Sequence, residues 1–138
     1  MTFSILILTF NEAANLPACL DSVAWADDIA VLASFSTDET VAIASDKGAR
    51  VFQRKFDDFG NHRNWTHDHI EFKHPWVFHF DADERFTPDL RKTCVEAVAE
   101  DRFSGFFVPN RIIFLGKWIR HCTRYPYHQV IVNEPLSA

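Results

Sequence analysis

The stretch "WVFHFDADERF", residues 76–86, joins an apolar run to three acids within four positions. Its first five residues can be buried on both faces, which is typical of a strand in a parallel sheet. Asp81, Asp83 and Glu84 follow, and carboxylates this close together repel one another unless a positive charge lies nearby. The stretch therefore predicts a buried strand that ends at a cation-binding turn.

Similar apolar runs occur earlier in the chain, at residues 3–8, 28–33 and 50–54, and helix signals lie between them. The first expected helix covers 16–23, with Pro17 in its first turn, and the second begins at a capping box of Ser36 and Glu39 and ends at Gly48. A third helix is expected over about 61–70, after a loop at 57–60. The fourth has Thr87 as its N-cap and Pro88 as its first residue. Residues 105–116 predict one or two further strands, with Pro109 at a bend or at a sheet edge.

Strand and helix signals alternate at least three times along the chain. This alternation predicts βαβ units in an α/β fold, with a mostly parallel central sheet and helices on both faces. In such sheets ligands bind beyond the carboxyl ends of the strands. Polar groups at 9–12, Ser34 and 81–83 each follow a predicted strand. We therefore expect these groups to converge on one edge of the sheet.

Size and composition narrow the class of protein. A chain of 138 residues that is 47% hydrophobic suits one folded domain. Its formal net charge of -5 argues against the broad basic face that nucleic-acid binding needs. The three cysteines are an odd number and far apart, so a reducing cytoplasm is expected rather than a disulfide framework. The apolar opening "MTFSILILTF" is shorter than a membrane span.

The D-x-D pair at the end of the fourth strand suits a hard divalent cation. Mg²⁺ and Mn²⁺ prefer oxygen ligands and accept substrate phosphates as further ligands. We therefore expect Asp81 and Asp83 to hold a metal that arrives with a phosphate ester. The alternative is that the two acids only solvate a strand end and lead into a turn.

Four segments occur in the order and spacing seen in family-two glycosyltransferases: "SILILTFNEAANLPACLDSV", "STDET", "FGNHRN" and "VFHFDADERFTPDL". With "RIIFLGKWIRH" near the end, the chain resembles bacterial members that build lipopolysaccharide core or other envelope glycans. The resemblance covers residues 3–126. It implies a GT-A fold, in which a Rossmann-like sheet binds a nucleotide-diphospho-sugar at its carboxyl edge.

By position, the resemblance also assigns residues to the donor site. It implies that residues 9–12 line the nucleoside pocket and that Arg63 lies near the nucleotide. It also implies that Asp81 contacts the ribose or sugar and that Asp83 holds Mg²⁺ or Mn²⁺. The donor-site residues are Thr9, Phe10, Asn11, Glu12, Ser34, Arg63, Asp81, Ala82 and Asp83.

The activity implied is inverting, metal-dependent transfer of a sugar to a glycan or lipid-linked acceptor in cell-envelope polysaccharide or lipopolysaccharide biosynthesis. Such an enzyme works in the cytoplasm, at the inner face of the membrane, where peripheral membrane contact is compatible with a chain of this kind. The catalytic base is expected beyond the matched region and has no assignment here. Glu134 matches no family position.

The chain departs from the family pattern at two places. Where relatives resemble "VVDSGSTD", this chain has Ala33 for the acid and Phe35 for the glycine. Where relatives resemble "YPDRQLRLF", it has Tyr127 and His128. We therefore expect a donor-binding domain over 1–126 and a divergent tail over 127–138, from a family domain truncated at its C-terminal side. Apolar strands left uncovered would then favour self-association.

Two other functions remain open on the sequence. A non-catalytic remnant or interaction module of the same fold would explain Ala33 and Phe35. A nucleotidyltransferase shares a similar sheet and acidic site, but "TFNEAANLP" has no glycine-rich phosphate loop.

Histidines and tryptophans give two weaker expectations. His62, His67, His69 and His74 could bind zinc, but surface histidines are the better interpretation because no cysteine pair accompanies them. Aromatic residues mostly serve the core, and Trp118, beside Arg120 and His121, is the tryptophan to examine as an acceptor-side residue.

Overall fold

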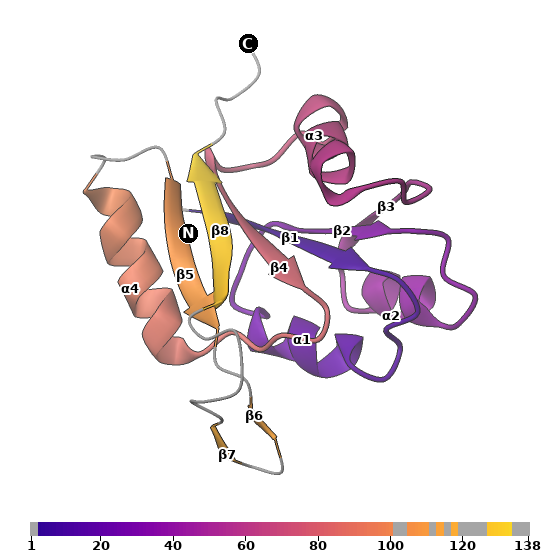
Figure 1. Cartoon of the computed structure of the whole chain (residues 1–138), viewed down its shortest axis with the longest axis horizontal. Coiled ribbons are helices and arrows are strands. Elements are labelled where there is room, and N and C mark those ends of the chain that lie inside the picture. The colour runs from indigo at the N-terminus through magenta and orange to yellow at the C-terminus, as the bar shows by residue number, and fades with distance from the viewer. Residues whose placement is uncertain (1–2, 101–104, 111–112, 115–116, 119–126, 134–138) are drawn as a thin grey trace.

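The computed structural model describes residues 3–100, 105–110, 113–114, 117–118 and 127–133 (Figure 1). Its main sheet has six strands in the order β3-β2-β1-β4-β8-β5. The first four strands along the chain pair in parallel, which confirms the predicted α/β fold. These strands are β1 (Ser4–Thr9), β2 (Ile29–Ala33), β3 (Arg50–Gln53) and β4 (Trp76–Asp81), and the helices are α1 (Leu16–Ser22), α2 (Thr40–Asp46), α3 (Phe59–His69) and α4 (Pro88–Ala99).

Helices cover both faces of the sheet because successive side chains of β1 point to opposite sides. Ile5 and Ile7 pack in one core cluster with residues of α1, α2 and α4. Leu6 and Leu8 pack in a second cluster with Ile70, which directly follows α3. In Figure 1, α3 accordingly lies on the other side of the strands from α1. Burial of each such side chain contributes about 1.5–3 kcal/mol.

The helix starts follow the predicted caps in part. Thr87 Oγ1 accepts a hydrogen bond from the Leu90 amide at 3.1 Å, so the predicted N-cap of α4 is confirmed. α3 begins two residues before its predicted start, because the Asp58 side chain caps it by accepting from Asn61 N–H at 2.7 Å. The capping box predicted for α2 is wrong, since this helix starts at Thr40 and the side chain of its N-cap residue, Glu39, makes no capping hydrogen bond.

Beyond β4, the main sheet continues with two antiparallel strands. β5 (Gly105–Asn110) is the edge strand, which agrees with the position predicted for Pro109. β8 (Tyr127–Asn133), which was not predicted, lies between β4 and β5 and is antiparallel to both. β6 (Ile113–Phe114) and β7 (Lys117–Trp118) pair in a separate two-stranded sheet.

The two cysteines in the described part, Cys19 and Cys94, are buried and form no disulfide. Burial raises the pKa of both thiols to about 12, which keeps them protonated. Cys122 lies outside the described residues. Among the helices of the described residues, none has the length and apolar character needed to cross a bilayer.

Candidate functional site

Two loops interlock at the carboxyl edge of the sheet, one after β1 and one after β2. The Asn11 amide donates to Ser36 Oγ at 3.0 Å, and the Thr37 amide donates to Asn11 Oδ1 at 2.7 Å. Asn11 adopts a φ of +50°, a left-handed conformation that asparagine tolerates better than most residues. Ser36 therefore holds the β1 loop in place and does not cap α2.

Asp38 completes this link between the loops. Its carboxylate accepts from the Ala13 amide at 3.2 Å and from the Thr40 amide at 3.0 Å, and it also pairs with the Thr40 hydroxyl. The hydroxyl bond, with the amide bonds, lowers the pKa of Asp38 although partial loss of water opposes this. The Glu12 amide in turn donates to Thr40 Oγ1 at 3.0 Å. The predicted donor-site residues Asn11 and Glu12 are thus held by the loop after β2.

The predicted acid cluster lies beside these loops, at the end of β4. Leu8 of β1 pairs with Asp81, so the ends of the two central strands are adjacent. Asp81, Asp83 and Glu84 each offer a ligand atom within 4.8 Å of the others. Glu84 belongs to the group through a tight turn, because its carboxylate accepts from the Asp81 amide at 3.1 Å. From the sequence, Glu84 is expected in the cluster but has no assigned role.

The electrostatics of Asp83 favour a cation. Asp83 is exposed as a residue, yet loss of water around its carboxyl raises its pKa, and the charges of Asp81 and Glu12 raise it further. Arg85 lowers it only in part. A carboxylate crowded by like charges is stabilised by a bound positive ion. The oxygen-only donor set fits Mg²⁺ or Mn²⁺.

Phe35 occupies the position where the family pattern has glycine. Its φ is +55°, so the backbone keeps the left-handed conformation that glycine adopts without strain. The side chain is 58% exposed and therefore gains little from burial. Phe10, in the loop after β1, is similarly exposed at 57%. Two aromatic rings thus stand in solvent at the loops of the candidate site.

We expect Phe35→Gly to stabilise the domain by about 0.5–1 kcal/mol. Left-handed backbone costs a residue with a side chain about 1–2 kcal/mol, and the greater freedom of glycine in the unfolded chain offsets part of that gain. Urea denaturation of the wild type and the variant measures the difference.

Phe10→Gly is the matched control, because Phe10 is as exposed as Phe35 but has no positive φ. It should lower the free energy of unfolding, since glycine then adds chain freedom without relieving strain. Equal destabilisation by both substitutions would show that the conformation of Phe35 carries no strain.

The remaining predicted donor-site residues come from β1, β2 and α3. Thr9 is only 6% exposed, and within the described residues its Oγ1 has no hydrogen-bond partner. The Nε atom of Arg63, in α3, is also buried and likewise lacks a partner there. Ser34 Oγ lies 3.3 Å from His62 Nε2, which brings α3 to the end of β2. Ala82 is buried between the two aspartates of the cluster.

The histidines have separate partners. His74 Nε2 contacts Asp27 Oδ1 at 2.8 Å, and His69 stacks on Trp65 with 4.4 Å between ring centroids. Among the described side chains, the acids at 81–84 are the one group of three with ligand atoms close enough to share an ion. The interpretation as surface histidines is wrong for His62, which is 2% exposed.

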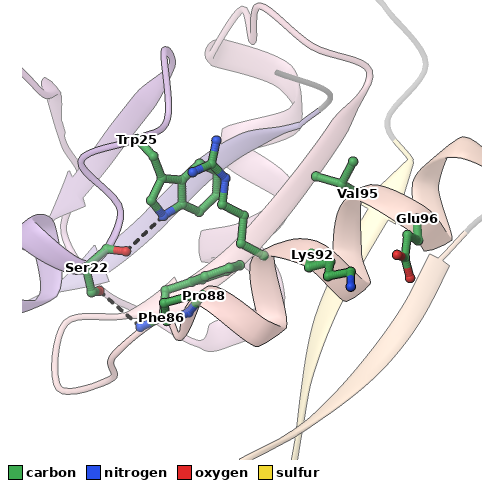
Figure 2. Close-up of a pocket in the computed structure, with 8 residues that line it drawn as sticks. Ser22, Trp25, Phe86, Pro88, Lys92, Val95 and Glu96 are labelled. Atoms are coloured by element: carbon green, nitrogen blue, oxygen red, sulfur yellow. Dashed lines mark hydrogen bonds between the residues drawn. The ribbon is translucent and has the colours of Figure 1, made fainter.

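A separate hollow of about 420 Å³ lies between the end of α1 and α4 (Figure 2). Trp25, Phe86 and Val95 line it, and none of the clustered acids does. Trp25 packs against Phe3 and Phe86 with centroid distances of 5.5 and 5.1 Å, so this half-buried ring borders the core. The Trp118 side chain, Arg120 and His121 lie outside the described residues.

Comparison with known proteins agrees with this architecture. The family model described as "Glycosyl transferase family 2" matches residues 4–132. Lipopolysaccharide core biosynthesis glycosyltransferase LpsC of Rhizobium meliloti is 29% identical over 122 residues, which cover 84% of this chain and 44% of that protein. The chain spans less than half the length of the curated relatives it matches.

Two solved structures share the fold at low sequence identity. Mannosyltransferase PcManGT from Pyrobaculum calidifontis, in complex with GDP-Man and Mn²⁺, has a TM-score of 0.67 at 16% identity, over 95% of this chain and 44% of that one. Glucosyl-3-phosphoglycerate synthase from Mycobacterium tuberculosis, in complex with uridine diphosphate, has a TM-score of 0.67 at 17% identity, over 96% of this chain and 56% of that one.

Proposed function

Because the chain belongs to glycosyl transferase family 2, we propose that it forms the donor-binding part of a metal-dependent, inverting glycosyltransferase. The sugar passes from a nucleotide-diphospho-sugar to a glycan or lipid-linked acceptor in cell-envelope polysaccharide or lipopolysaccharide biosynthesis. The named relative in lipopolysaccharide core biosynthesis supports this acceptor class. In this role the protein lies in the cytoplasm at the inner face of the membrane, contacts the membrane peripherally and associates with other copies of itself.

One observation carries the proposal: the acid cluster at 81–84 lies at the same sheet edge as the interlocked loops after β1 and β2. Parallel sheets bind nucleotides at this edge. The neighbour with GDP-Man and Mn²⁺ supports the pairing of a nucleotide sugar with a divalent ion.

The proposed roles follow from the chemistry of each side chain. Asp83 and Asp81 hold the ion, and Asp81 also contacts the ribose or sugar. When bound, the ion stabilises the charge that develops on the departing diphosphate. The guanidinium of Arg63 presents a fork suited to phosphate oxygens, and its buried Nε needs a partner. The residues at 9–12 and Ser34 line the nucleoside pocket.

The proposal is tested by calorimetric titration of the chain with UDP and GDP, with and without Mn²⁺. UDP is bound in one of the similar structures, and GDP is the nucleoside diphosphate part of the GDP-Man bound in the other. We expect binding of at least one nucleotide in the presence of Mn²⁺ and its loss on addition of EDTA. Absence of binding by either nucleotide at millimolar concentration, with Mn²⁺ or Mg²⁺ present, would overturn the proposal.

A second candidate is a non-catalytic remnant or interaction module of the same fold. Ala33 and Phe35 favour it, because the family carboxylate is missing from the end of β2 and the family glycine from the loop that follows. A turnover assay with a panel of sugar nucleotides and envelope acceptors separates the two functions. Release of nucleoside diphosphate above background would exclude the remnant.

A further inference from the structure

His62 is a buried imidazole with a polar partner at each ring nitrogen. Its Nε2 lies 3.3 Å from Ser34 Oγ, and its Nδ1 lies 3.1 Å from a terminal nitrogen of Arg54. The Phe56 ring packs edge-on against the imidazole at a centroid distance of 5.4 Å. A histidine at 2% exposure with both nitrogens engaged has a fixed orientation.

The partners decide which nitrogen carries the proton. A guanidinium has hydrogen-bond donors and no acceptor, so Arg54 can only donate to Nδ1. Neutral His62 therefore carries its hydrogen on Nε2 and donates to Ser34 Oγ. Asp57 holds Arg54 in this position through two hydrogen bonds of 2.7 and 3.1 Å.

The imidazole is neutral at physiological pH. Burial lowers the pKa of His62, and the positive charge of Arg54 lowers it further, although Asp57 opposes this in part. A proton on Nδ1 would also face the donor hydrogens of Arg54 directly. Both effects favour the Nε2–H tautomer.

This arrangement leaves the Ser34 hydroxyl able to donate a hydrogen bond. Within the described residues, Ser34 Oγ has no hydrogen-bond partner other than His62. A hydroxyl that accepts one hydrogen bond still has its own hydrogen to donate. Ser34 lies at the end of β2, where its amide donates to the Thr9 carbonyl at 3.2 Å. The hydroxyl is therefore at the edge where the donor nucleotide is proposed to bind.

We propose that His62 is a positioning residue of the donor site, which holds the Ser34 hydroxyl as a hydrogen-bond donor to an oxygen atom of the bound nucleoside diphosphate. The inference rests on the proposed function.

The test combines NMR with calorimetry on the whole chain. Long-range ¹H–¹⁵N spectra of wild-type protein should show His62 as the Nε2–H tautomer. With UDP or GDP and Mn²⁺ as probes, His62→Leu and Ser34→Ala should each weaken binding about 5–10-fold. The double variant should lose no more than either single one, because both remove the same hydrogen bond. His62→Gln, whose amide nitrogen can replace Nε2–H, should bind within about 2-fold of the wild type.

His69→Gln is the control for a change of histidine in α3, since the exposed His69 stacks on Trp65, whereas Ser34 is held by His62. It should leave binding unchanged. An Nδ1–H tautomer, or nucleotide binding by His62→Leu equal to that of the wild type, overturns the inference alone. If wild-type protein binds neither nucleotide, the proposed function is overturned and the inference with it.

Discussion

Asp83→Ala should weaken Mn²⁺-dependent binding of a nucleoside diphosphate by on the order of 100-fold or more, beyond the 10–100-fold typical when a group supporting a metal ligand is lost. A carboxylate oxygen of Asp83 lies within 4.8 Å of ligand atoms from Asp81 and Glu84. Removal of one acid leaves fewer hard oxygen ligands for the proposed divalent ion. Calorimetry with UDP and GDP, with and without Mn²⁺, measures the loss.

The free energy of unfolding of Asp83→Ala distinguishes loss of a metal ligand from loss of binding through misfolding. Because loss of water around its carboxyl, together with neighbouring negative charges, raises the pKa of Asp83 in the folded state, its ionised form opposes folding. The metal-free variant should therefore be at least as stable as the wild type while it loses binding. Asp46→Ala, which removes an exposed carboxylate from α2, is the matched control and should bind normally. Equal affinity of wild type and Asp83→Ala would remove the metal assignment.

Asp28→Ala should lower the free energy of unfolding by about 2–4 kcal/mol, because it leaves buried donors without their acceptor. Asp28 is 7% exposed at the start of β2. Its carboxylate accepts from Ser4 Oγ at 2.6 Å, the Lys73 amide at 2.8 Å and Arg50 at 2.7 Å. It thus joins the starts of three parallel strands at the edge opposite the candidate site. Urea denaturation measures the loss.

Asp27→Ala is the control for the neighbouring carboxylate. Asp27 pairs with Lys73 at 2.5 Å and with His74 at 2.8 Å, but its side chain is more exposed than that of Asp28. Solvent screens such pairs, so the loss of stability should be much smaller. Similar losses for the two variants would show that the buried hydrogen bonds of Asp28 have no special importance.

The same carboxylate predicts a pH dependence. Burial alone would raise the pKa of Asp28, but hydrogen bonds from Ser4 and Lys73 and the charge of Arg50 lower it overall. A carboxyl with a lowered folded pKa stabilises the protein fully above the unfolded value of about 3.9 and loses that contribution as the pH falls further. Stability of the wild type should fall more steeply below that value than stability of Asp28→Ala.

Much of the fold could be predicted because its signals are local. The apolar run before Asp81 predicted β4, and the Thr87-Pro88 pair predicted the start of α4, as the structure confirms. The acid cluster could also be predicted, since its members lie within four positions of one another. Such features depend on neighbours in the chain, and a sequence displays neighbours directly.

The errors concern contacts between distant residues. Ser36 was predicted to cap α2, but its hydroxyl accepts from Asn11, which lies 25 positions away. His62 was interpreted as a surface residue of a helix, yet packing of α3 against the sheet buries it beside Ser34. In both cases the local pattern was compatible with another structure, and tertiary packing selected the partner.

The amino-acid sequence alone determined the alternating strands and helices, the family to which the chain belongs, and the acids that follow β4, because short-range periodicity and residue chemistry carry this information. Only the tertiary structure decided that the loop after β2 holds Asn11, that Asp28 joins three strands, and that Arg54 and Ser34 meet the two nitrogens of one imidazole. Hydrogen bonds between residues far apart in the chain require donors and acceptors to be brought within about 3 Å, and that placement exists only after the sheet and its helices have packed.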